Sequence, residues 1–382
     1  MEESIFGRLG IIAMEGCEKI AEQVNSYINT FRGTDSNYII KTECPRFGSG
    51  EGKGMLRESV RGLDLFIICD CFNYAVGCKM REVPKDKRYK SPDEHYADLK
   101  RIVGAVEGKA RRISVIMPML YEGRQHKRTQ RESLDCAMML RELEIYGVEN
   151  FITFDAHDDR VANAIPLIGF DNYRPTYQMI KALVNNIPDI SFERDHLIII
   201  SPDEGAMGRC MYFSSVLGID VGMFYKRRDY SRVVGGRNPI VAHEYLGCDL
   251  TGKDVIIVDD MISSGESMID VARQIKSRGA KRVLSFATFG LFTDGLDRFD
   301  EAYRDGVLDR VFVTNLVYFP EEFKTHPWFV EVNMCKYIAY IVDTLNHDQS
   351  TSVIIDPIKK IHALVDRHNA ESQAQMKIDF EK

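Results

Sequence analysis

The stretch that decides the fold runs from residue 254 to residue 278 and reads DVIIVDDMISSGESMIDVARQIKSR. Residues 254–258 are mostly apolar, which is typical of a strand that is covered on both faces in a parallel sheet. The acidic pair Asp259 and Asp260 follows, and after it comes a loop of small residues. Apolar residues then recur at helical spacing and predict an amphipathic helix. The stretch therefore predicts a strand, an acidic pair, a small-residue loop and a helix.

The loop in this stretch has the composition of an anion-binding site. Loop amides at the start of a helix offer unpaired N–H groups, and the helix dipole also favours negative charge there. Gly265 lets the backbone approach a ligand closely, and the serine hydroxyls beside it add donors. Asp259 and Asp260 suit sugar hydroxyls or a magnesium-bound substrate. The pattern indicates a phosphorylated sugar, and the alternative is an ordinary capped helix after a strand.

The rest of the chain repeats the order strand, loop, helix, which predicts an α/β fold with a parallel sheet. The segments 139–157 and 271–289 share one layout, in which a helix ends at Gly147 or Gly279 and a strand comes next. This layout predicts a duplicated domain with a boundary near 171–175, although any two such units look alike. The predicted strands are 63–69, 113–117, 151–154, 197–200, 254–258 and 283–289.

Composition narrows the class of protein. The chain has 382 residues, and one domain per roughly 150 residues predicts two or three domains. It holds 50 Lys and Arg against 57 Asp and Glu, and the net charge of −7 argues against bulk nucleic-acid binding. The nine cysteines are scattered, and Cys69 and Cys71 lack the usual zinc spacing. No signal peptide and no apolar run of about 18 residues is present, so we expect a reduced, cytoplasmic protein without a membrane partner.

The loop at 259–267 resembles the ribose-binding loop of the type I phosphoribosyltransferase fold. Phosphoribosyltransferases share this fold with the ribose-phosphate pyrophosphokinases. The resemblance implies two related domains, 1–172 and 173–382, each with a mostly parallel sheet flanked by helices. It also implies that the acidic pair holds the ribose hydroxyls and that the loop holds the 5-phosphate. The implied ribose 5-phosphate residues are Asp259, Asp260, Ser263, Ser264, Gly265, Glu266 and Ser267.

Three segments of the first half resemble the nucleotide-binding segments of the pyrophosphokinases. Residues 47–51 read FGSGE and resemble the adenine-binding segment, residues 121–128 read YEGRQHKR, and residues 155–157 read DAH. A basic loop is otherwise more often solvated, and a lone histidine at a strand end is more often structural. The resemblance implies ATP binding by Phe47, Ser49, Glu51, Arg124, Gln125 and His157.

Two segments of the second half resemble the metal-binding turn and the catalytic loop of the same family. Residues 201–205 read SPDEG, and the resemblance makes Asp203 a magnesium ligand together with His157. The alternative for Asp203 is a helix N-cap. Lys226 and Arg228 begin a polar stretch that reaches residue 245 and match the cations of a flexible catalytic loop. The implied catalytic residues are Lys226, Arg228 and His157.

The resemblance implies a Mg²⁺-dependent ribose-phosphate diphosphokinase that uses ATP and ribose 5-phosphate. It also implies a homo-oligomer, a hexamer built from dimers. Ser263 stands where a third Asp is usual, and Ser49 stands where Asn is usual, so a divergent member is indicated. Two alternatives remain open, a phosphoribosyltransferase and a non-catalytic regulatory subunit. The extra residues near 81–95 and at the C-terminus have no functional interpretation.

Overall fold

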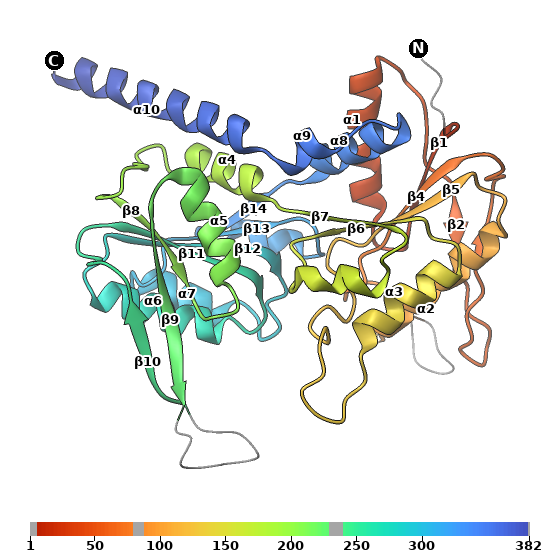
Figure 1. Ribbon diagram of the computed structural model, residues 1–382, viewed down its shortest axis with the longest axis horizontal. Coiled ribbons are helices and arrows are strands. Elements are labelled where there is room, and N and C mark those ends of the chain that lie inside the picture. The colour runs from red at the N-terminus through yellow and green to blue at the C-terminus, as the bar shows by residue number, and fades with distance from the viewer. Residues whose placement is uncertain (1–5, 79–87, 229–239, 381–382) are drawn as a thin grey trace. The chain divides into compact units, whose positions relative to one another are not determined.

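The computed structural model describes residues 6–78, 88–228 and 240–380, and of 226–228, 240–243 and 372–380 it describes the backbone alone. Figure 1 shows two α/β units. Unit 1 comprises Met1–Pro175, Asn315–Phe319 and Asn333–Asp356, and unit 2 comprises Thr176–Thr314, Pro320–Val332 and Pro357–Lys382. The first boundary lies close to the predicted one. The residues predicted as one domain over 173–382 are divided in the structure, because Asn315–Phe319 and Asn333–Asp356 belong to unit 1.

Unit 1 contains a five-stranded parallel sheet in the order β1-β4-β5-β6-β7. Its strands are β1 (Leu9–Ala13), β4 (Asp64–Ile68), β5 (Arg112–Ile116), β6 (Asn150–Phe154) and β7 (Gly169–Tyr173). Its helices are α1 (Glu18–Arg32), α2 (Pro92–Val106), α3 (Asp135–Ile145), α8 (Cys335–Asn346), α9 (Ser352–Ile355) and the 3-10 helix η2 (Asp159–Ala164). A separate small ladder pairs β2 (Thr42–Glu43) with β3 (Met55–Leu56).

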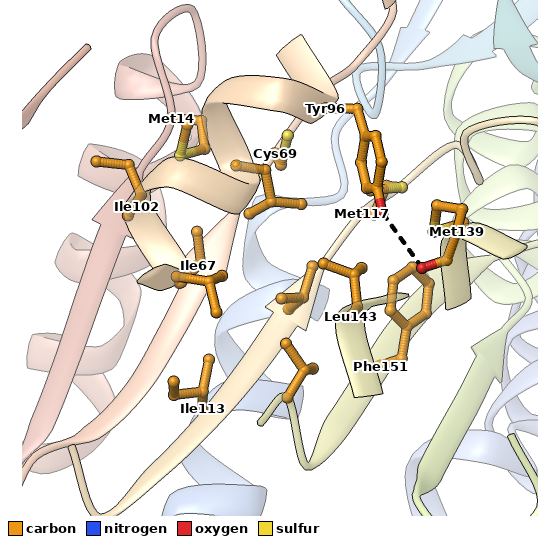
Figure 2. Close-up of a cluster of buried hydrophobic side chains, with 14 of the residues drawn as sticks. Met14, Ile67, Cys69, Tyr96, Ile102, Ile113, Met117, Met139, Leu143 and Phe151 are labelled. Atoms are coloured by element: carbon orange, nitrogen blue, oxygen red, sulfur yellow. Dashed lines mark hydrogen bonds between the residues drawn. The ribbon is translucent and has the colours of Figure 1, made fainter. Parts of the chain in front are cut away.

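Strands β4 and β5 of unit 1 are buried on both faces, as their apolar runs predict. Figure 2 shows the core on the face that α2 and α3 cover, where the Tyr96 hydroxyl donates to the Met139 carbonyl at 3.3 Å. Helix α8 packs against α1, with the rings of Phe31 and Tyr340 stacked at 4.2 Å. The Arg32 guanidinium also donates to Asp343 at 2.7 Å. These contacts explain why α8 belongs to unit 1.

Unit 2 contains a seven-stranded sheet in the order β10-β9-β8-β11-β12-β13-β14, in which β10 is antiparallel and the rest are parallel. Its strands are β8 (Leu197–Ser201), β9 (Asp220–Arg228), β10 (Ile240–Leu246), β11 (Asp254–Ile262), β12 (Arg282–Gly290), β13 (Arg310–Thr314) and β14 (Phe329–Val332). Its helices are α4 (Thr176–Asn186), α5 (Met207–Leu217), α6 (Glu266–Ser277), α7 (Asp297–Arg304), α10 (Ile358–Phe380) and the 3-10 helix η3 (Glu321–Thr325).

The two mostly parallel sheets are confirmed. Gly147 and Gly279 have φ values of +87° and +84°, so both adopt the left-handed conformation predicted for a helix end. The backbone at 225–228 and 240–245 forms the antiparallel pairing of β9 and β10, so the two ends of the predicted loop are strand residues. Gly235 and Gly236 lie outside the described residues.

The C-terminal helix α10 is fastened to unit 2 by two histidines. His362 Nε2 lies 3.0 Å from the Val216 carbonyl, and His368 Nε2 lies 2.8 Å from the Ile190 carbonyl. Helix α10 therefore packs on unit 2, although Asn333–Asp356, which comes before it in the chain, belongs to unit 1. Within the described part of the chain, none of the helices has the length and apolar character that a membrane crossing requires.

Candidate functional site

The acidic pair lies inside a strand and not after it. The apolar run predicts a strand that ends at Val258, but β11 continues to Ile262. Its parallel pairing with β12 accounts for the extension, because the two strands stay paired as far as Ile262. On the other side, β8 pairs with β11 only as far as Ile257. Asp259 and Asp260 are therefore held by a regular strand whose opposite edge is no longer covered by β8.

Arg209 of α5 lies against both carboxylates of the acidic pair. One of its two terminal guanidinium nitrogens is 3.8 Å from Asp259 Oδ1, and the other is 3.8 Å from Asp260 Oδ2. The backbone N–H of Asp260 also donates to Asp259 Oδ1 at 2.9 Å. Burial and the charge of Asp260 raise the pKa of Asp259 well above its usual range, and Arg209 acts in the opposite direction.

Arg209 was not among the site residues predicted from the sequence. It could have been found from its position, because it comes shortly after the SPDEG turn. That turn follows β8 directly, and β8 is the neighbour of β11 in the sheet. The carboxyl ends of neighbouring parallel strands meet at one edge of a sheet. A charged residue early in the helix after β8 was therefore a candidate neighbour of the acidic pair.

The loop after β11 leads into α6 without a side-chain cap. Gly265 is the N-cap residue with φ +79°, and no side chain makes the capping hydrogen bond. The carbonyl of Ser263 accepts the Thr293 amide at 3.0 Å, which ties the loop to the next segment. The first N–H groups of a helix have no acceptor within the helix. The Ser264 hydroxyl accepts the Glu266 amide at 3.4 Å, and within the described residues the next two amides of the first turn donate to no other partner and remain for a ligand.

Gly265 is expected to be required for this loop. A Cβ at Gly265 would lie 2.3 Å from the Phe299 ring, in a left-handed conformation that already disfavours a side chain. Left-handed strain alone costs about 1–2 kcal/mol. We expect Gly265→Ala to cost about 1–3 kcal/mol more than that, because the ring must shift. Thermal unfolding followed by the fluorescence of Trp328, the one tryptophan in the chain, measures the loss.

Gly252→Ala is the matched control for this substitution. Gly252 has φ +74° in the same unit, and a Cβ there meets nothing within 4 Å. It therefore reports the left-handed strain without the clash. Equal destabilisation by the two substitutions would show that Phe299 does not constrain the loop.

Asp203 orders the turn between β8 and α5. Its Oδ1 accepts the amides of Gly205 at 2.9 Å and Ala206 at 3.2 Å, and its carbonyl accepts the Ser201 hydroxyl at 2.6 Å. Asp203 is not the helix N-cap that the sequence left open, because Ala206 is the N-cap residue of α5 and no side chain caps that helix. Within the described residues, Oδ2 accepts no hydrogen bond, so one oxygen is left for a cation.

The FGSGE segment forms a tight turn in unit 1. The Phe47 amide donates to the Glu51 carbonyl at 2.8 Å, and the Ser49 hydroxyl donates to Glu51 Oε2 at 2.6 Å. The Phe47 ring is 58% exposed, so it is available to a planar ligand. Over the described part of unit 1, no hydrogen bond or ring contact joins this turn to Arg124 or Gln125.

The loops after β5 and β6 lie together. The rings of His126 and His157 are 5.4 Å apart, and His126 Nε2 is 3.4 Å from Asp158 Oδ2. Asp155 has φ +41°, a strained value for a residue with a side chain. Arg124 is exposed, and the Gln125 amide group donates to the Ser133 carbonyl at 2.9 Å.

The structure thus joins two of the predicted nucleotide segments, 121–128 and 155–157. It also adds His126 and Asp158, which the sequence analysis did not select. Their signal was again the shared edge of two neighbouring parallel strands, β5 and β6. His126 stood inside a segment already singled out, but nothing in that segment alone ranked it above its basic neighbours.

The predicted catalytic cations lie on β9. Lys226 pairs with His243 of β10, and Arg228 pairs with Ile240. The side chains of both residues lie outside the described part of the structure. Their backbones lie on a strand at the antiparallel edge of the sheet of unit 2, and the register shifts between Ile240 and Ala242.

Two family models match most of the chain. The model of the N-terminal domain of ribose phosphate pyrophosphokinase matches residues 9–147. The model of the phosphoribosyl transferase domain matches residues 171–305. The first range covers the sheet of unit 1 up to the start of β6, and the second covers the acidic pair and the loop before α6.

Curated relatives and a solved structure agree with these models. The ribose-phosphate pyrophosphokinase of Ralstonia nicotianae is 27% identical over 302 residues, 78% of this chain and 83% of the relative. Ribose-phosphate pyrophosphokinase A of Dictyostelium discoideum is 23% identical over 355 residues, 92% of this chain and 99% of the relative. Phosphoribosylpyrophosphate synthetase from Mycobacterium smegmatis has the same fold, with a TM-score of 0.70 at 21% identity over 89% of this chain and 99% of that one.

Proposed function

Because the chain belongs to the ribose-phosphate pyrophosphokinase family, we propose that it transfers the β,γ-diphosphoryl group of ATP to ribose 5-phosphate. The products are phosphoribosyl diphosphate and AMP. The observation that carries the proposal is the edge of β11 in unit 2. An acidic pair stands there directly before a helix that begins without a cap.

Each part of that edge suits one end of the sugar phosphate. Ionised Asp259 and Asp260 accept hydrogen bonds from the ribose hydroxyls. The 5-phosphate accepts from the amides of the 263–267 loop, where the dipole of α6 adds a favourable potential. Ser263 supplies a hydroxyl where family members usually carry a carboxylate, so one negative charge fewer stands beside the ribose.

The nucleotide is assigned to unit 1. The exposed ring of Phe47 stacks on the adenine, with Ser49 and Glu51 as its polar neighbours. Arg124, Gln125 and His157 contact the phosphates of ATP, and the 5.4 Å distance between the rings of His126 and His157 supports a role for a second imidazole beside them. These assignments rest on the family resemblance together with the geometry of each segment.

Transfer itself requires positioning and positive charge. The 1-hydroxyl of the sugar attacks the β-phosphorus in line, and AMP leaves. Phosphoryl transfer needs little covalent chemistry from the protein, so rate comes from cations near the equatorial oxygens. Lys226 and Arg228 are the residues that we assign to this role.

Asp203 and His157 are assigned to magnesium. Asp203 keeps one carboxylate oxygen for a cation, which is the type of ligand that Mg²⁺ prefers. Within the described residues, no three His, Cys, Asp or Glu side chains form a metal site by themselves. This fits an ion held mainly by substrate phosphates. When bound, magnesium neutralises charge on the phosphate oxygens.

The deciding experiment monitors AMP. Purified protein with ATP, ribose 5-phosphate and Mg²⁺ is expected to release AMP and phosphoribosyl diphosphate in equal amounts. Omission of ribose 5-phosphate is the control and should abolish AMP release. A protein that instead releases pyrophosphate from phosphoribosyl diphosphate and a base, without ATP, is a phosphoribosyltransferase. A protein that binds ATP but turns over neither set is a regulatory subunit.

The assembly and the compartment belong to the same proposal. We expect a homo-oligomer, a hexamer built from dimers, which light scattering of the purified protein measures. None of the nine cysteines forms a disulfide in the structure. Cysteines outside disulfides fit a reducing compartment, and we propose the cytoplasm for this protein.

A further inference from the structure

We propose that Arg209 is a positioning residue that keeps Asp259 and Asp260 ionised together and aimed at the sugar. The inference rests on the proposed function, because it concerns the ribose end of that site. Arg209 is assigned no contact with the substrate. It acts through the two carboxylates that bind the substrate.

One side chain rarely contacts two consecutive residues of a strand, as Arg209 does with Asp259 and Asp260 of β11. Neighbouring residues of a strand point to opposite faces, so one side chain reaches both carboxylates only from the edge of the strand. That edge is open beyond Ile257, where the pairing with β8 ends. Arg209 is 11% exposed, and each of its two terminal nitrogens lies 3.8 Å from one carboxylate.

The charges explain why a shared cation is needed. The Asp260 side chain is 5% exposed and the Asp259 side chain is 27% exposed, so the two adjacent carboxylates are partly shielded from water. Burial and the neighbouring charge favour the protonated form of Asp259, and Arg209 is the cation that opposes them. Cys210 is the other titratable group of α5 near the pair, and burial raises the pKa of its thiol to about 12. The thiol is therefore neutral and adds no charge.

Within the described residues, the neighbours of the pair in the register of the two adjacent strands are uncharged. In the parallel register with β12, Ala287 lies opposite Asp259, and Phe289 lies opposite Met261. On the other side, the last pairing with β8 joins Ile257 to Ile200.

Ionisation matters because of what a sugar offers. Ribose hydroxyls donate to a carboxylate, whereas a protonated carboxyl has lost part of its accepting capacity. Binding that depends on the ionised pair is present above the pKa of Asp259 and is lost as the pH falls through it. Removal of Arg209 raises that pKa further. We call the range in which ribose 5-phosphate affinity falls with falling pH the acid limb. Removal of Arg209 therefore moves the acid limb to higher pH.

The test measures ribose 5-phosphate binding by calorimetry from about pH 5 to about pH 9 in the wild type and in three variants. We expect Arg209→Gln to move the acid limb upward by about one pH unit or more, which weakens binding about tenfold on the limb. Affinity returns towards the wild-type value at the alkaline end. Arg209→Lys keeps a charge but not the two-pronged geometry, so a smaller shift in the same direction is expected.

Arg273→Gln is the matched control. Arg273 is an exposed arginine of the same unit, 3.4 Å from Asp270 on its own helix, and its removal is expected to leave the profile unchanged. The titration of the ligand's own phosphate is common to all four proteins, so the differences between profiles isolate the protein group. Tryptophan fluorescence checks that each variant is folded, and Arg209→Lys carries the test if Arg209→Gln does not fold.

The outcomes separate two failures. If the wild type binds ribose 5-phosphate and both Arg209 variants keep its profile, the inference is wrong and the proposed function stands. A loss of equal size at every pH also overturns the inference, because it means that Arg209 supports the fold and not the ionisation of the pair. If the wild type does not bind ribose 5-phosphate, the proposed function fails and the inference fails with it.

Discussion

Replacement of Lys226 by alanine is expected to lower kcat by about 10²- to 10³-fold, the usual cost of losing one charge-stabilising group. The reason is that its ammonium group is assigned to the transferring diphosphoryl group, whose charge is largest in the transition state. An interaction made only in the transition state lowers kcat and kcat/KM equally. Affinity for ribose 5-phosphate should therefore stay within about twofold of the wild type.

Initial rates of AMP release measure kcat, and calorimetry measures the ribose 5-phosphate Kd. Lys281→Ala is the control, because Lys281 is a half-exposed lysine of the same unit at the start of β12. It should leave both quantities unchanged. A parallel loss of kcat and of ribose 5-phosphate affinity in Lys226→Ala would make the lysine a binding residue and contradict its catalytic assignment.

Replacement of Asp64 by asparagine is expected to lower the free energy of unfolding of unit 1. Asp64 is fully buried at the start of β4 and accepts two hydrogen bonds of 2.7 Å from the Arg112 guanidinium. The Asn346 amide group of α8 donates to the same carboxylate at 2.8 Å. Asp64→Asn leaves the buried charge of Arg112 without its partner, and loss of one member of a buried pair costs about 3–5 kcal/mol.

Hydrogen exchange of the β4 and β5 amides measures this loss within unit 1. The control is Glu43→Gln, which removes the partner of Arg57 from an exposed ion pair and should leave exchange in β4 and β5 unchanged. A cost for Asp64→Asn below about 1 kcal/mol would mean that this buried pair contributes no more than an exposed one.

Local patterns in the chain predicted the elements of the fold. Apolar runs such as 197–200 and 254–258 became buried strands, because a strand covered on both faces needs no polar alternation. Gly147 and Gly279 became left-handed helix ends, because glycine adopts positive φ at little cost. These features depend on neighbours in the sequence, so they can be read without the tertiary structure.

The ends of the strands were harder to predict from the sequence than the strands themselves. The acidic pair reads as the end of a strand, since charged residues usually stop an apolar run. The pairing of β11 with β12 carries the strand past both carboxylates to Ile262. Backbone hydrogen bonds to a neighbouring strand decide this limit, and that neighbour begins at Arg282, beyond the helix that separates the two strands in the sequence.

The amino-acid sequence by itself determined the α/β class and the two sheets, and it supplied the candidates for the phosphosugar loop and the nucleotide segments. Only the tertiary structure decided which distant residues share a site or a core. It brought Arg209 of α5 to Asp259 and Asp260, and it returned α8 to unit 1 through Arg32 and Asp343. Such contacts form because parallel strands far apart in the chain end at one edge, and because a helix packs wherever its apolar face finds a partner.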